Sequence, residues 1–522
     1  MAEKATLSKV ENLTWSARLD EADDLCKAGF GDTVTTARAQ LTHGHVSLFR
    51  MWIAGYVQDA RTAISQLDLA ILTAESGIKS LTSIQKSRGE LTDLQAFDLE
   101  DYRLVAAEGT MFKATMQLYA GDTMKGMINF RSAFKLYENE LKRVTAEYKD
   151  AAVDWRPSAS ELPKARRVSD VEQRICFEEG EREFVGFSAG WRFGLGFYML
   201  YISMVPVKLL RILELVGFVV DRELGFGLLA QAVAEMKAED IATVPVTGYF
   251  SVHAMLWFLF DFSISSFTPS EMAFKERIAL GEQLLDTVES LCPDSIVWGW
   301  LRFWGLRQQG RLLEGNEIIF ESFAKYEEQN RNPAPLSESR IASDLQVNLL
   351  MSMSYERARE LSKETIQKSD PSKSLPLYAF ATLGVSELIL GMKSEAEATL
   401  SQASKYNATR HLGEVESMIS VKLKLFPQRV YPWVAFGELV LSVFATEWIH
   451  ADDALTIANH LLDALGPLES DRRKKTAMQK GPSRGSRTLA IMRKVPLTPT
   501  SSGDSNTDEL TAAYVACASL LR

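Results

Sequence analysis

Cysteine is scarce in this chain of 522 residues, and no two of its cysteines form a C-x-x-C pair. The four lie far apart, at Cys26, Cys176, Cys292 and Cys517. Such usage is typical of a reducing compartment, and it excludes a disulfide framework and a zinc site built on cysteine pairs.

Positive charge is not in excess either, because the formal net charge is −10 at pH 7. Without a general field that attracts phosphate groups, we expect no nucleic-acid partner. The segment Met1 to Val10 has neither the apolar core of a secretion signal nor the arginine-rich pattern of a transit peptide. It predicts a cytoplasmic protein.

The chain also lacks the short motifs that hold metals and nucleotides. It has no H-E-x-x-H pair and no Walker loop, and Gly194 and Gly196 lack the strand and helix of a dinucleotide site. We therefore expect no metal, no cofactor and no small-molecule substrate. We interpret His43-Gly44-His45 as a turn. The six histidines are His43, His45, His253, His411, His450 and His460.

One catalytic motif is present. Gly186 to Gly190 matches G-x-S-x-G, which places the nucleophilic serine of α/β-hydrolases on a strand-to-helix turn. The preceding residues 171–183 are charged and have a helical pattern, which does not suit that turn. We therefore predict a non-enzymatic protein, and a hydrolase that uses Ser188 is an alternative.

Long uncharged runs are few. Phe193 to Val207 is too short to span a bilayer, and Lys208 follows it at once. Residues 242–260 are just long enough, but Pro245, Gly248 and His253 interrupt them. We interpret both runs as buried helices, and a membrane span is an alternative.

What the chain has in abundance is helical pattern. Hydrophobic residues make up 46% and charged residues 24%, a balance typical of a folded, soluble protein. From Leu19 to Glu147 apolar residues recur at intervals of three and four, and proline is absent. Because 522 residues exceed one ordinary core, we expect several domains or an extended repeat array.

The clearest internal signal is a helix pair between Phe380 and Ala403. Its spacing matches a tetratricopeptide repeat, in which small residues let two helices cross closely while large residues fill the flanks. Ser394 and Glu397 predict a capping box at the start of the second helix. The residues that carry the pattern are Phe380, Leu383, Gly384, Gly391, Ala396, Leu400 and Ala403.

A partial copy of this pair lies 270 residues upstream, in a hairpin predicted from Leu99 to Leu141. Gly121 can take the left-handed conformation that closes such a hairpin. Weaker copies begin at Trp300 and Trp433. The matching residues of the upstream copy are Ala114, Gly121, Gly126, Phe130 and Ala133.

The most apolar long segment, Gly190 to Gln231, is interpreted as a joint between two halves of the array. Pro206 can begin a helix, Gly217 can close it, and Asp221, followed by Arg222, can cap the next one. Three helices with fixed turns are predicted there.

Composition predicts the order of the parts along the chain. The parts are an N-terminal helical repeat block at 1–150, a linker at 151–170, a helical array at 171–468, a basic disordered loop at 469–507 and a terminal helix at 508–522. The loop carries Arg472, Arg473, Lys474 and Lys475, a candidate nuclear-import signal or contact for anionic lipid.

The joint and the earlier helix pair together resemble the tetratricopeptide repeat protein 39 family, which includes the fungal inclusion body clearance proteins. The resemblance covers roughly residues 107–433. This chain departs from it at Tyr198, Val207 and Val220, where phenylalanine, proline and glycine are more usual. The resembling parts are Gly194, Gly196 and Tyr198, Ile202 to Pro206, Lys208 and Leu209, Gly217 to Arg222, Gly126 to Arg131, and Tyr137.

Stacked helix pairs predict an all-α, curved solenoid whose concave face binds peptides or helices of other proteins. The resemblance likewise implies a non-enzymatic scaffold or adaptor for other proteins, and it supplies no catalytic residue. It also implies an alternative, a protein with peripheral contact to the mitochondrial or lipid-droplet surface and a role in lipid handling or aggregate clearance. We expect the cytoplasm, with the nucleus or the cytosolic face of those organelles as alternatives.

Overall fold

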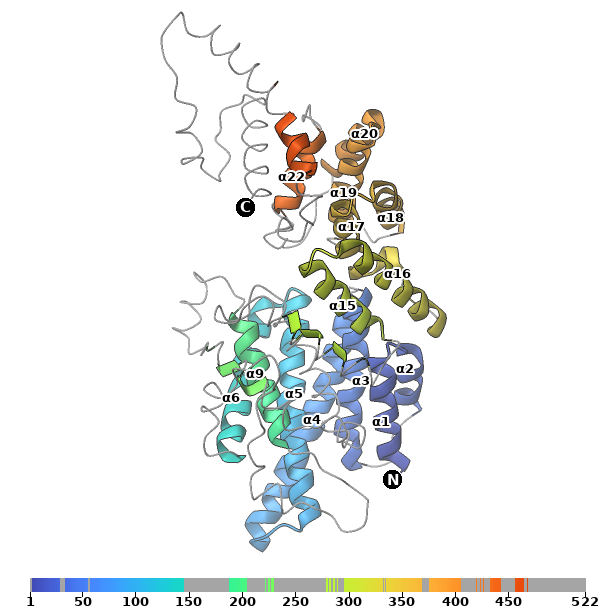
Figure 1. The fold of residues 1–522 in the computed structure, drawn as a ribbon. Helices are drawn as coiled ribbons and strands as arrows, with labels where there is room; N and C mark the ends of the chain where they lie inside the picture. The colour runs from blue at the N-terminus through green and yellow to red at the C-terminus, as the bar shows by residue number, and fades with distance from the viewer. Residues whose placement is uncertain are drawn as a thin grey trace, which may run out of the picture. The chain divides into compact units, whose positions relative to one another are not determined.

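The computed structural model describes the chain in several stretches. These are residues 2–28, 33–54, 57–144, 187–203, 295–331, 335–368, 375–404, 432–442 and 456–463, with isolated positions at 221–229, 278–289, 333, 419–426 and 467. Every regular element in these stretches is a helix (Figure 1). The predicted all-α fold of stacked helix pairs is confirmed.

The longer helices alternate with short connections. They are α1 (Ala2–Trp15), α2 (Leu19–Lys27), α3 (Thr33–Ala54), α4 (Val57–Arg88), α5 (Asp93–Tyr119), α6 (Thr123–Val144), α9 (Phe187–Ser203), α15 (Ile296–Gln308), α16 (Leu312–Gln329), α17 (Arg340–Met351), α18 (Tyr355–Lys368), α19 (Leu375–Ile389), α20 (Lys393–Ser404) and α22 (Pro432–Ser442), with a 3-10 turn η2 at Leu336–Glu338.

The chain divides into two compact units. Unit 1 comprises Met1–Gly305 and Ile318–Ala334, and unit 2 comprises Leu306–Glu317 and Pro335–Arg522. The sequence of α16 is therefore shared between the two units. The predicted linker at 151–170, the basic loop at 469–507 and the terminal helix at 508–522 lie outside the described residues.

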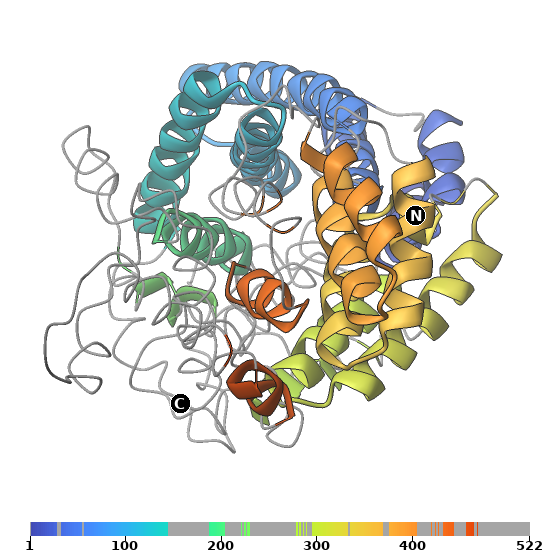
Figure 2. The ribbon, with the colours of Figure 1, turned by 90° about the horizontal axis from the view of Figure 1, so that it is seen from above.

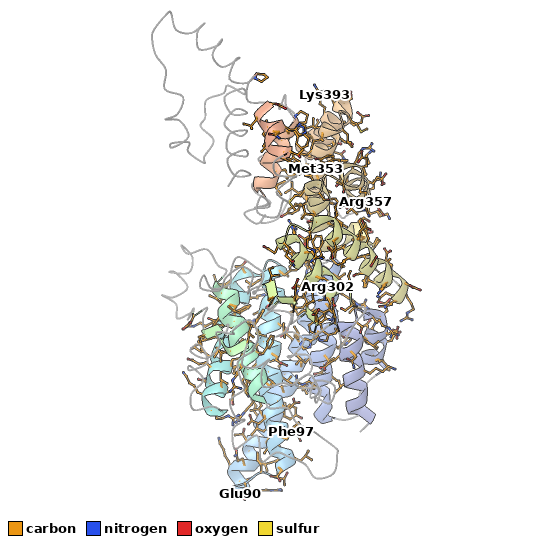
Figure 3. All side chains as sticks on the ribbon, in the orientation of Figure 1. Glu90, Phe97, Arg302, Met353, Arg357 and Lys393 are labelled. Carbon is orange, nitrogen blue, oxygen red and sulfur yellow. The ribbon has the colours of Figure 1, made fainter. Side chains whose placement is uncertain are left out.

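In unit 1, consecutive helices pack against each other: α3 on α4, α4 on α5, α5 on α6, and α6 on α9. Figure 2 shows the long α4 together with α5 and α6, and Figure 3 shows Glu90 at the tip of the α4–α5 hairpin. Large apolar side chains fill the interior, among them the fully buried Trp15, Phe49, Phe112 and Trp191.

In unit 2, the first helix of each pair packs on its own partner and on the first helix of the next pair. Helix α19 contacts α18 and α20, and it also contacts α17 and α22. It is so enclosed that every residue from Ala379 to Leu388 is buried. Because α19 is enclosed on all sides, apolar residues occur all around its circumference, and Thr382, Ser386 and Glu387 are buried among them.

A residue with positive φ follows the first helix in six helix hairpins, and the five other than the one at Gly89 share one hydrogen-bonded turn. The positive-φ residues of these five turns are Ala17, Gly121, Gly310, Met353 and Gly391. At Gly121 the next amide, Asp122 N, donates to Gln117 O at 2.8 Å, and at Gly391 the amide of Met392 donates to Glu387 O at 2.8 Å. The amide of the turn residue itself also donates, from Gly121 N to Leu118 O at 3.1 Å and from Gly391 N to Leu388 O at 3.2 Å. The two hydrogen bonds within each turn form the Schellman motif, which satisfies carbonyls that the helix would otherwise leave unpaired.

Two local predictions need correction, and one local feature was missed. His43-Gly44-His45 is not a turn but lies inside α3. The capping box at Ser394 and Glu397 is wrong, because Ala396 N already donates to Met392 O at 3.0 Å and the helix begins at Lys393. A capping box that we did not predict starts α5, where Gln95 N donates to Thr92 Oγ1 at 3.3 Å and Thr92 N donates to Gln95 Oε1 at 3.1 Å.

Candidate functional site

The α19–α20 pair brings the residues of the predicted repeat together. A Cβ placed on Gly384 would lie 2.5 Å from Leu400 Cδ2, so the two helices are closer than any larger residue would allow. Phe380, Leu383, Ala396, Leu400 and Ala403 are all buried, and Gly391 closes the turn at φ +77°.

The α5–α6 pair has the same geometry 270 residues earlier. Ala114 and Phe130 are fully buried. A Cβ placed on Gly126 would lie 3.1 Å from Ala114 O and 2.8 Å from Leu118, and Gly121 has φ +90°.

A polar contact between the two helices also recurs, and the sequence patterns did not point to it. In α5–α6, Asn129 Nδ2 donates to Gln117 Oε1 at 2.7 Å. At the equivalent positions of α19–α20, Thr399 Oγ1 donates to Glu387 Oε2 at 2.8 Å. In both pairs the two residues lie four positions before and eight positions after the turn glycine, and this common spacing could have predicted the contact.

Glu387 extends this contact to a third helix. Its carboxylate lies 3.7 Å from Arg359 Nε and 4.0 Å from Lys363 Nζ, both on α18, while its own side chain is only 2% exposed. A buried carboxylate needs such partners, so Glu387 joins α18, α19 and α20.

The predicted joint is described only in part. A Cβ placed on Gly194 of α9 would lie 1.9 Å from the Tyr137 ring of α6, which explains the glycine at this crossing. Asp221 Oδ1 accepts a hydrogen bond from Leu224 N at 2.9 Å. Pro206, Gly217 and Arg222 lie outside the described residues, as do Arg472, Arg473, Lys474 and Lys475.

A buried ionic cluster crosses the core of unit 1. Arg38 of α3 donates from Nη2 to Asp101 Oδ1 at 2.7 Å and from Nη1 to Glu108 Oε2 at 2.8 Å. The two carboxylates are seven residues apart on α5 and therefore share one helix face. Glu11 of α1 and His45 of α3 lie in the same charged environment.

Burial shifts the titration of this cluster. Burial raises the pKa of the Glu11 carboxyl well above its usual value, against the opposing charge of Arg38. Burial and the charge of Arg38 lower the pKa of His45, and burial with the charge of Glu108 raises the pKa of Tyr137 on α6. Glu11 and His45 are therefore both favoured in their neutral forms.

The cluster is closed to solvent, because Glu11, Arg38, His45 and Glu108 are each at most 4% exposed. A substrate could not reach these groups without opening the helix packing. Removing one partner of such a buried pair is costly, so we interpret the cluster as a device that fixes the register of α1, α3 and α5.

Other candidate sites gain no support in the part of the chain that the structure describes. Ser188 lies in the first turn of α9, and the residues before Phe187 are not described. Within the described stretches no group of three or more His, Cys, Asp or Glu side chains is placed to hold a metal ion. No described helix is both long enough and apolar enough to cross a membrane.

Helix α6 carries a group of uncovered apolar and basic side chains. Met124 is 76% exposed, Ile128 58% and Leu136 40%. Lys125, Arg131 and Lys135 are exposed beside them. With about 100° between successive residues, these six positions fall within about 140° of the helix surface. We call Met124, Lys125, Ile128, Arg131, Lys135 and Leu136 the α6 face.

Comparison with known proteins gives one family match and distant structural neighbours. The model of a family described as Iml2/Tetratricopeptide repeat protein 39 matches residues 16–431. A solved structure of Naa15/Naa10 bound to HypK-THB is 12% identical with a TM-score of 0.30, over 91% of this chain and 87% of that chain. A circular tandem repeat protein is 10% identical with a TM-score of 0.22, over 100% and 98%.

Proposed function

The chain belongs to the Iml2/tetratricopeptide repeat protein 39 family, and on that basis we propose that it is a non-catalytic scaffold that binds other proteins. Helical repeat arrays bury one side of each helix in stacking and leave other faces uncovered for recognition. The proposed location is the cytoplasm, in keeping with the acidic composition and the spaced cysteines.

The observation that carries this proposal is the α6 face. Its three apolar side chains are exposed, while the opposite side of the same helix is fixed by the buried Phe130 and Phe134. Clustered exposed apolar side chains on a soluble domain are typical of an interaction surface.

The concave face of an array is the other surface to consider. In unit 2 the enclosed stretch Ala379 to Leu388 of α19 offers no exposed side chain for a ligand. The exposed side chains of the adjacent α18 and α20 are mostly polar. We therefore favour the α6 face of unit 1 as the primary recognition surface.

The test is affinity capture with the full chain as bait, followed by quantitative mass spectrometry. The variant M124S/I128S/L136S is compared with L69S/L72S, which removes two leucines that are 52% and 62% exposed on α4. Selective loss of the captured proteins with the α6 variant supports the proposal. Equal capture by both variants would exclude the α6 face as the recognition surface.

A further inference from the structure

We propose that the α6 face binds an acidic, amphipathic α-helix of a partner protein. This proposal rests on the scaffold function above and specifies the chemistry of its partner.

The basic residues of the α6 face have no acidic partner among the residues that the structure describes. Within the described part of the chain, no carboxylate lies at ion-pair distance from Lys125, Arg131 or Lys135. The nearest acids of the same helix are already engaged, since Glu138 pairs with Lys142 and Glu140 pairs with Arg143. The face therefore carries positive charge in a protein whose net charge is −10.

A complementary partner surface must supply negative charge. Complementary charge at an interface directs the encounter and selects the partner. By contrast, the exposed Leu69 and Leu72 of α4 have acidic residues one to three positions away in the sequence, at Asp68 and Glu75, so that second apolar group is not selectively basic.

The apolar residues of the α6 face form a row along one side of the helix. Met124, Ile128 and Leu136 are spaced by four and eight residues, which covers about 18 Å along the helix axis. A second helix with apolar residues every three or four positions matches such a row, because ridges of one helix fit grooves of the other.

This geometry favours a protein helix over a lipid surface. Helices that lie in a bilayer interface present a wide apolar sector below a basic one. Here Lys125 and Lys135 lie between the apolar residues around the helix, and Arg131 lies at the edge of that sector, so insertion of the apolar side would carry the charges of the two lysines into the apolar layer.

The α6 face is also held rigid before any partner arrives. Asn129 is hydrogen-bonded to Gln117 of α5, and Tyr137 packs edge-on against Trp191 of α9 with ring centroids 5.7 Å apart. Figures 1 and 2 show α6 beside α5 and α9, which cover its inner side. A preordered face loses little conformational entropy on binding.

The first experiment uses site-specific photo-crosslinking from position 128 of the full chain in cell lysate, with mass spectrometric identification of the linked segment. We expect segments rich in Asp and Glu with apolar residues at three- and four-residue spacing. Linkage to lipid, to basic or non-helical segments, or to another part of this same chain would overturn the proposal.

The second experiment measures fluorescence anisotropy with a synthetic Leu/Glu amphipathic helix of about 20 residues as the probe. The reversal variant K125E/R131E/K135E is expected to bind at least about tenfold more weakly than wild type, and added salt to weaken the wild-type complex. The matched control K79E/K86E/R88E reverses three exposed cations on α4 and should bind like wild type.

The outcomes separate the two proposals. Equal binding of the Leu/Glu helix and a Leu/Lys helix, or binding of phosphatidylserine vesicles but not of the Leu/Glu helix, would overturn the acidic partner. Loss of captured proteins in M124S/I128S/L136S but not in K125E/R131E/K135E would support the scaffold function and exclude an acidic partner. A chain that captures no protein at all would contradict the scaffold function itself.

Discussion

Trp15 stacks on Trp298, with ring centroids 5.1 Å apart and ring planes 8° from parallel. The first ring ends α1 and the second lies in α15, so the contact joins the beginning of unit 1 to one of its last helices. Phe49 of α3 meets Trp15 edge-on at 4.7 Å. Both tryptophans are almost wholly buried, so this contact holds the two ends of unit 1 together inside its core.

Trp15→Ala should destabilise unit 1 by about 3–5 kcal/mol, because it removes a fully buried indole and leaves a cavity against Trp298 and Phe49. Trp15→Phe keeps most of the apolar volume and should cost clearly less. Urea unfolding of the full chain, followed by circular dichroism, measures both. An alanine variant that unfolds with the wild-type profile would show that the Trp15–Trp298 contact does not stabilise unit 1.

Asn330 provides a second contact between the two ends of unit 1. Its Nδ2 donates to Ala17 O at 2.8 Å and to Tyr326 O at 2.9 Å, and its Oδ1 accepts from Leu19 N at 3.0 Å. One amide thus serves the ends of α16 and α1 and the start of α2.

Asn330→Ala should destabilise the chain by about 1–3 kcal/mol, because three backbone groups lose their partner at once. Neighbouring Arg331, whose exposed side chain pairs with Asp24, is the matched control. Arg331→Ala should destabilise the chain clearly less than Asn330→Ala, because an exposed ion pair contributes little to stability. Hydrogen exchange at the Leu19 amide gives the local measurement, and equal exchange in both variants would exclude the role of Asn330.

Glu11 predicts a pH dependence of stability. Its pKa in the folded chain is raised above the ordinary 4.5, so the folded state holds a proton that the unfolded state releases. The stability that depends on neutral Glu11 is complete below pH 4.5 and is lost as the pH rises toward the folded-state pKa.

Glu11→Gln keeps the neutral shape, so its stability relative to wild type should increase steadily above pH 4.5, by at most about 1.4 kcal/mol per pH unit. Comparing the two at each pH removes the opposing contribution of His45, whose lowered pKa costs stability below pH 6.5. Glu21→Gln, at a half-buried acid paired with Arg18, is the control. Parallel stability profiles of wild type and Glu11→Gln between pH 5 and pH 8 would rule out a contribution of neutral Glu11 to stability.

The turn at Gly391 predicts the order in which three substitutions destabilise the protein. Its φ is +77° and a Cβ placed there would have no neighbour within 4 Å, so substitutions act through the backbone alone. Gly391→Ala should destabilise unit 2 by about 1–2 kcal/mol, Gly391→Asn should cost less, and Gly391→Val should cost more. Thermal unfolding gives the ranking, and an equal effect of all three would show that the backbone conformation is not decisive.

The sequence reveals local features well where one residue type is required. Gly121 and Gly391 marked two hairpins because glycine adopts positive φ without strain. Ala17 and Met353 take the same conformation with no such mark. There the closing hydrogen bonds and the packing of the two helices outweigh the local preference.

Contacts between distant segments could not be predicted in this way. Asp101 and Glu108 share a helix face in any helical reading, but nothing in the pattern shows that Arg38 reaches them inside the core. The α6 face posed the opposite problem. Met124 and Ile128 have the spacing of core residues, and only the folded structure shows that both side chains are exposed.

The reach of Asn330 back to Ala17 has a consequence for biosynthesis. The two residues are 313 positions apart, so the α1–α2 hairpin leaves the ribosome long before its partner exists. At about 5–20 residues per second, that interval is about 15–60 s. For most of it, the indole of Trp15 lacks the ring of Trp298, and the first residues of unit 2 are made before unit 1 is finished. The α1–α2 hairpin therefore spends that interval without its contacts to the end of unit 1.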